Sequence, residues 1–198
     1  MELDIVLLPP RSVSKKIGRF MLKLAKAYDF WFVVDNSKLK PHISLLHLKA
    51  TSNRLRSITR ALQKISQEQK KIKIQGKGHH LGRKFLVASF VLPKELYYLH
   101  QQIVKTISVF RTGIVNLPFG EKNDKQKQYI KTYGVGNLFE FYTPHITLAW
   151  ARKKSSLPKI LGELLRLKFS SLILDRLAVA QVNNRYQVIK ILREFKLK

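Results

Sequence analysis

Two short segments of the chain carry the same residue types in the same order. The sequence PHISL occupies positions 41–45, and PHITL follows 103 positions later at 144–148. Each copy lies in an apolar run typical of a β-strand, whose side chains alternate between two faces. Each places a histidine two residues before a hydroxyl, as the pairs His42/Ser44 and His145/Thr147. Histidine and hydroxyl should therefore point the same way, and two such pairs would bracket a tetrahedral anion such as a phosphodiester.

Breaking a phosphodiester needs one proton to leave the attacking oxygen and another to reach the departing oxygen. Histidine, with an ordinary pKa of about 6.5, performs either task near neutral pH. We predict that His42 and His145 form this acid/base pair, in an order that the similar motifs leave open. Ser44 and Thr147 would donate hydrogen bonds to the non-bridging oxygens, where charge builds up in the transition state. Such a site needs no metal or cofactor, and the chain offers no cysteine and no tight carboxylate cluster to hold one.

The elements expected around the two motif strands follow nearly the same order. A strand at 3–8 opens the chain, and each motif strand has a helix before it and a helix and a hairpin after it. The ranges are 12–28, 53–69 and 71–91 around the first motif, and 93–110, 156–167 and 172–192 around the second. This repetition predicts an α+β fold with internally duplicated antiparallel sheets, flanking helices and a central cleft. We expect one bilobal domain over 1–198, with lobes of roughly 1–92 and 93–198.

A polar segment without periodicity precedes the second motif. Gly113 to Gln128 is long for a connection in a compact domain, and it is either a binding loop or lid, or a disordered insert. A short strand is expected at Tyr129 to Tyr133, before the second motif strand at Tyr142 to Trp150.

The remaining histidines are weaker candidates. His47 lies five residues after His42, so on a regular strand it faces away from the cleft in a structural or exposed position. His79 and His80 lie beside the glycines of a predicted hairpin turn and are expected at the surface. His100 is expected to be partly buried in the middle of a helix.

Aromatic and basic residues near the motifs are candidates for substrate contact. Tyr142 could stack on an unpaired base, although alternation turns it away from His145 unless Pro144 bends the strand. Trp150 shares the parity of the apolar motif residues and is expected in the core. Several basic residues could reach a phosphate, none of them specifically: Lys40, Arg83, Arg152 and Arg185.

The chain is strongly basic along its whole length. It has 38 Lys and Arg against 12 Asp and Glu, for a net charge of +26. Such a field attracts polyanions, which favours a nucleic-acid partner. Because most of these residues are lysines, contacts to the phosphate backbone are expected rather than base readout. A general preference of the source for lysine is the alternative explanation.

The paired motifs resemble those of the 2H phosphoesterase superfamily. The sequence PHITLA at 144–149 is similar to the second motif of bacterial RNA 2′,3′-cyclic phosphodiesterases, historically called 2′-5′ RNA ligases. With Trp150 added, it is also similar to exonucleases that trim the 3′ ends of spliceosomal RNA. The resemblance implies a bilobal α+β fold and metal-independent chemistry on RNA or a nucleotide phosphodiester. By motif alignment it implies His42 and His145 as the acid/base pair, and Ser44 and Thr147 as the phosphate holders.

We therefore expect a phosphodiesterase that opens a 2′,3′-cyclic phosphate or cuts a 2′-5′ linkage. One alternative is a 3′-to-5′ RNA exonuclease that leaves a cyclic phosphate end, and another is an RNA-binding module without catalysis. No apolar run is long enough for a membrane span, and the first eight residues have the wrong charge order for a signal peptide. The expected protein is an intracellular monomer, cytoplasmic or nuclear, without membrane, metal or cofactor.

Overall fold

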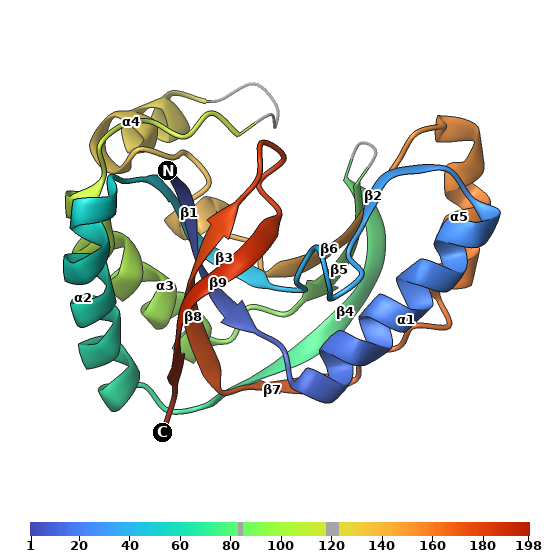
Figure 1. The fold of residues 1–198 in the computed structure, drawn as a ribbon, viewed down its shortest axis with the longest axis horizontal. Coiled ribbons are helices and arrows are strands. Elements are labelled where there is room, and N and C mark those ends of the chain that lie inside the picture. The colour runs from blue at the N-terminus through green and yellow to red at the C-terminus, as the bar shows by residue number, and fades with distance from the viewer. Residues whose placement is uncertain (83–84, 118–122) are drawn as a thin grey trace.

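The computed structural model describes residues 1–82, 85–117 and 123–198. Their strands form two antiparallel sheets, one of four strands and one of five. In Figure 1 the first sheet lies toward helices α2 and α3 and the second toward α1 and α5. The predicted α+β class with flanking helices is confirmed. Within the described ranges, no helix has the length and apolarity that crossing a membrane requires.

The first sheet carries the first motif and has the strand order β3-β1-β8-β9. Its strands are β1 (Glu2–Leu8), β3 (Ile43–Lys49), β8 (Arg176–Val182) and β9 (Val188–Lys196). Helix α2 (Leu55–Glu68) packs against β8 and β9, and α3 (Lys94–Ile107) packs against β3. The helices form because their apolar residues recur every three or four positions, as at Ile58, Leu62 and Ile65, which are all buried.

The second sheet carries the second motif and has the order β2-β6-β5-β4-β7. Its strands are β2 (Phe30–Val33), β4 (Ile72–Gly82), β5 (Phe85–Phe90), β6 (His145–Ala151) and β7 (Ser171–Leu174). Helix α1 (Arg11–Ala27) packs against β2 and β6, and α5 (Leu157–Leu164) packs against β4. Single turns of 3-10 helix complete the described elements: η1 (Ser52–Arg54), η2 (Ser108–Phe110), η3 (Phe139–Phe141) and η4 (Lys154–Ser156).

Strand β1 is buried on both of its faces. Ile5 and Leu7 join the main hydrophobic core, while Val6 and Leu8 belong to a smaller cluster with apolar residues of β8 and β9. Because side chains alternate along a strand, Asp4 lies on the same face as Val6 and Leu8. Asp4 is the one carboxyl among the buried residues of this strand, whose other buried side chains are apolar.

The two sheets do not divide the chain at residue 92. Strands β8 and β9, from the end of the chain, pair with β1 in the first sheet, while β4 and β5 pair with β6 in the second. The first arm of the hairpin predicted over 172–192 is interrupted at Asp175, so that β7 joins one sheet and β8 the other. Hydrophobic alternation indicates a strand but carries no information on which neighbour it will choose.

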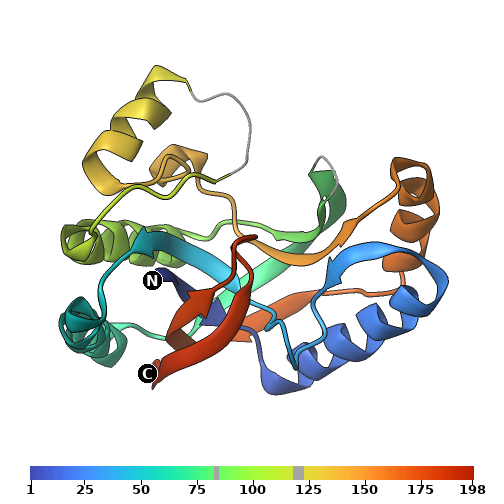
Figure 2. The same ribbon diagram turned by 45° about the horizontal axis from the view of Figure 1, so that its top comes forward.

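The expected strand at Tyr129 to Tyr133 is wrong, because these residues end helix α4 (Asp124–Tyr133). Asn123 caps this helix: its side chain accepts from Gln126 N at 2.8 Å, and the Gln126 side chain accepts from Asn123 N at 3.3 Å. Gly134 ends it with a φ of 89°, which glycine adopts readily. Of the aperiodic segment at 113–128, positions 118–122 lie outside the described residues, and its last part is helical (Figure 2).

Candidate functional site

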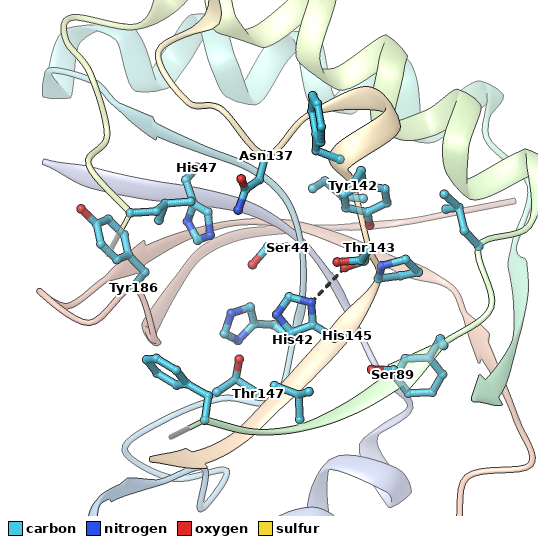
Figure 3. Close-up of a pocket in the computed structure, with 18 of the residues that line it drawn as sticks. His42, Ser44, His47, Ser89, Asn137, Tyr142, Thr143, His145, Thr147 and Tyr186 are labelled. Carbon is cyan, nitrogen blue, oxygen red and sulfur yellow. Dashed lines mark hydrogen bonds between the residues drawn. The ribbon is translucent and has the colours of Figure 1, made fainter. Parts of the chain in front are cut away.

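The two motifs meet at one cavity of about 910 Å³. His42, immediately before β3, and Ser44 on β3 line it from one side, and His145 and Thr147 line it from β6. Figure 3 shows the two histidine rings side by side with a hydroxyl near each. The structure thus brings together all four residues singled out in the sequence, although they come from two different sheets.

Both histidines are held by the same backbone contact. The Nδ1 atom of His42 lies 2.8 Å from the carbonyl oxygen of Lys40, and Nδ1 of His145 lies 2.9 Å from that of Thr143. A carbonyl only accepts, so Nδ1 carries the hydrogen in each ring and Nε2 is left as the basic atom. In each motif the accepting residue lies two positions before the histidine, with proline between them. The repeated PH dipeptide therefore sets both tautomers alike.

Burial governs the protonation of the pair. It lowers the pKa of His42 to about 4, with a further contribution from the positive charge of protonated His145. Burial also lowers the pKa of His145. At neutral pH both rings are therefore neutral in the protein by itself. A bound phosphodiester would raise both pKa values again, because a nearby negative charge favours the protonated ring.

A β-bulge interrupts the first motif strand and reverses its alternation. In the pairing of β1 with β3, Ile5 lies opposite Leu46 but Val6 lies opposite Ser44, so Leu45 is the extra residue. As a result His47 turns to the same face as Ser44 and lines the cavity. The expectation that His47 faces away was wrong because it assumed a regular strand.

The second motif strand has a bulge at the matching position. In the pairing of β5 with β6, Leu86 lies opposite Ala149 but Val87 lies opposite Thr147, so Leu148 is the extra residue. The expectation that Trp150 lies in the core is therefore wrong. Trp150 is partly exposed and stacks on Phe85 with a ring-centroid distance of 4.9 Å.

Asp4 is a site residue that the sequence reading missed. Its Oδ2 lies 2.6 Å from Ser44 Oγ, 3.4 Å from His47 Nδ1 and 3.8 Å from His42 Nε2. Burial raises its pKa to about 8, against the lowering effect of hydrogen bonds from Ser44 and the Leu46 backbone. The signal available in the sequence was a single carboxylate inside the apolar run at 3–8.

His100 is fully buried, which corrects the expectation of partial burial. Its Nδ1 lies 2.9 Å from the carbonyl oxygen of Leu45, and its Nε2 accepts from Phe139 N at 3.0 Å. Burial lowers its pKa to about 4, so the ring is neutral. The ring thereby satisfies the carbonyl of the bulge residue and supports the shape of the first motif strand.

Tyr142 lines the cavity but is only 8% exposed. One face of its ring is stacked on His100, with centroids 4.0 Å apart and an interplanar angle of 7°. Its hydroxyl has no hydrogen-bond partner among the described residues. Stacking of a base on Tyr142 would have to use what remains of the other face, and it stays a prediction.

Three of the remaining candidates, His79, His80 and Arg185, also line the cavity. His79 and His80 belong to β4, not to a turn; both line the cavity, and the exposed His80 contacts Ser89 Oγ through Nδ1 at 2.8 Å. Arg185 lines the cavity and donates to the Trp31 carbonyl at 3.2 Å. Three basic candidates remain. Lys40 donates to the backbone of its own loop, Arg152 pairs with Asp29, and Arg83 lies outside the described residues.

No group of three or more His, Cys, Asp or Glu side chains in the described part of the chain is arranged to hold a metal ion. The two motifs instead bring two neutral imidazoles and two hydroxyls to the cavity, and the buried carboxyl of Asp4 lies against Ser44. These groups can accept and donate protons and hydrogen-bond an anion.

A family model described as the 2′-5′ RNA ligase superfamily matches residues 9–185. No curated protein sequence matches the chain. Among solved structures, protein TT0787 of Thermus thermophilus is similar with a TM-score of 0.61 at 12% identity, covering 100% of this chain and 98% of that one. LigT of E. coli complexed with 3′-AMP has a TM-score of 0.61 at 15% identity, with coverage of 100% and 98%. The apo form of the same LigT has a TM-score of 0.57 at 13% identity, with coverage of 100% and 97%. At these identities the likeness concerns the fold.

Proposed function

Because the chain belongs to the 2′-5′ RNA ligase superfamily, we propose that it is a metal-independent phosphodiesterase acting on RNA ends or nucleotides with a 2′,3′-cyclic phosphate or a 2′-5′ linkage. Membership of this superfamily supports phosphodiesterase-type activity. The solved complex of E. coli LigT with 3′-AMP supports a nucleotide as the class of substrate. The net charge of +26 supports a polyanion such as RNA.

The observation that carries the proposal is the matched pair of histidines at one cavity. Each is anchored through Nδ1 to a backbone carbonyl and each has a motif hydroxyl on the same strand. In the proposed reaction one neutral Nε2 takes a proton from water as the water oxygen attacks phosphorus. The other histidine, protonated once the phosphate is bound, gives its proton to the departing ribose oxygen as the P–O bond breaks. Ser44 and Thr147 hold the non-bridging oxygens.

A short RNA ending in a 2′,3′-cyclic phosphate, incubated in EDTA with products resolved by mass, tests the proposal. The wild type should add one water to the intact oligomer. His42→Ala and His145→Ala should each lose about 100-fold to 10,000-fold in rate, since each removes one proton transfer. Gln102→Ala, an exposed change on α3, is the folded control and should match the wild type.

Other products of the same incubation would replace the proposal by an alternative. Stepwise shortening with accumulation of cyclic ends would indicate a 3′-to-5′ exonuclease. No turnover of cyclic or 2′-5′-linked substrates, with RNA binding that survives loss of both histidines, would indicate a binding module. Activity that is lost in EDTA and restored by a divalent ion would refute the metal-independent mechanism. A bell-shaped dependence of kcat, which reports the enzyme with substrate bound, is expected of the histidine pair, with limbs between about pH 5 and 8.

A further inference from the structure

The two halves of the site differ in the pair of residues that lies three positions after each motif hydroxyl and on the strand opposite it. Across the strands, Asp4 lies opposite His47 in the first sheet, and Phe85 lies opposite Trp150 at the corresponding place in the second. In the second half an aromatic stack fills this position. The first half instead buries a carboxyl, which is costly because a buried carboxyl loses its hydration. A purely structural position could be filled by an apolar pair, as the second half demonstrates.

The contact between Asp4 and Ser44 determines what the serine can do. The hydroxyl of Ser44 has one proton, and its Oγ lies 2.6 Å from Asp4 Oδ2. If the carboxyl is ionised, it accepts a hydrogen bond from Ser44, whose only proton is then not available to a phosphate. If the carboxyl is protonated, it donates to Ser44 Oγ, and the serine proton is free to point into the cavity.

The surroundings of Asp4 favour the protonated carboxyl. The titratable groups that face it are His42 and His47 from the first motif segment and Tyr142 from the segment before β6; the residue opposite it on β8 is Ala180. Burial keeps both histidines neutral near pH 7 and holds the pKa of Asp4 at about 8. No ion pair of Asp4 with lysine or arginine occurs within the described residues.

We propose that Asp4 is a positioning residue that acts as a neutral hydrogen-bond donor to Ser44 and so frees the serine hydroxyl to donate to the substrate phosphate. This inference rests on the proposed phosphodiesterase function. Ionisation of Asp4 reverses the hydrogen bond and places a second negative charge beside the phosphate. Ser44 then loses its role, while Thr147 is unaffected.

The test compares Asp4→Asn with Asp4→Ala in hydrolysis of the cyclic-phosphate RNA between pH 6 and 9.5. The asparagine amide donates to Ser44 at every pH, so Asp4→Asn should stay within about threefold of the wild type at pH 7 and lose less activity above pH 8. Asp4→Ala and Ser44→Ala should each lose about tenfold to 100-fold in kcat/KM, and the double variant should be no worse than either. Asp124→Asn, at an exposed carboxyl, is the matched control.

Two outcomes would overturn the inference. One is an Asp4→Asn variant as inactive as Asp4→Ala, which would mean that the negative charge is needed. The other is a titration of the Asp4 carboxyl near pH 4, followed by nuclear magnetic resonance of its carboxyl carbon. The signal is assigned to Asp4 because it is absent from the spectrum of Asp4→Asn. The titration needs no turnover, so it tests the inference even if the wild type proves inactive and the proposed function fails.

Discussion

Replacing Asp4 by asparagine should stabilise the protein at neutral pH and leave its stability unchanged near pH 3.5. The carboxyl is fully buried, and its pKa is raised from 3.8 to about 8. Between these two values the folded protein binds more protons than the unfolded chain. The free energy of unfolding therefore falls as the pH rises through this window. Asparagine does not titrate, so the variant escapes this loss.

The magnitude follows from the width of the window. Each pH unit between 3.8 and about 8 costs about 1.4 kcal/mol, which amounts to roughly 4 kcal/mol at pH 7. The asparagine amide can still donate to Ser44, so the hydrogen bond at this position is kept. For a chain of 198 residues, such a gain corresponds to a rise in Tm of about 8–16 °C.

Urea unfolding of wild type and Asp4→Asn at pH 3.5, 5, 7 and 8 would measure the difference in unfolding free energy. Protonation of His100, which has no recorded contact with Asp4, affects both proteins and cancels in this difference. Asp124→Asn, whose side chain is 99% exposed, should show no such pH-dependent gain. A gain that is constant with pH, or a variant less stable than the wild type at pH 8, would refute the reasoning. Either result would mean that Asp4 is ionised in the folded protein.

Three further predictions concern stability and binding. His100→Ala should lower the unfolding free energy by about 3–5 kcal/mol in urea, because it leaves the Leu45 carbonyl and the Phe139 amide unpaired and creates a cavity; an effect under about 1 kcal/mol would contradict this. His42, His47 and His100 have folded pKa values of about 4, 3 and 4, so protonation favours the unfolded chain. Three such groups outweigh the opposite trend of the single Asp4 carboxyl, so stability should fall as the pH drops from about 6.5 towards 4, and an unchanged Tm between pH 7 and 5 would disagree. The affinity for a short RNA should fall at least about tenfold between 50 and 200 mM salt, and a flat response in fluorescence anisotropy would make the basic surface incidental.

The sequence by itself determined how the side chains of the two motifs are arranged. Histidine and hydroxyl lie two positions apart, and a strand places such residues on one face whatever the rest of the chain does. The proline before each histidine belongs to the same local pattern. The histidine Nδ1 contacts the carbonyl oxygen of the residue before that proline, two positions back in the chain. The α+β class also followed from local periodicity. These features depend on neighbours in the chain.

Only the tertiary structure decided which residues complete the site. The bulges at Leu45 and Leu148 exist because β3 and β6 shift register against their partner strands, and they turn His47 and Trp150 to the cleft face. In the sequence, the bulges correspond to two adjacent apolar residues at 45–46 and at 148–149, which interrupt the alternation of each motif strand. Asp4 reaches Ser44 from 40 residues away through the pairing of β1 with β3. Register and strand order arise from the packing of whole sheets, and side-chain alternation within one strand does not encode them.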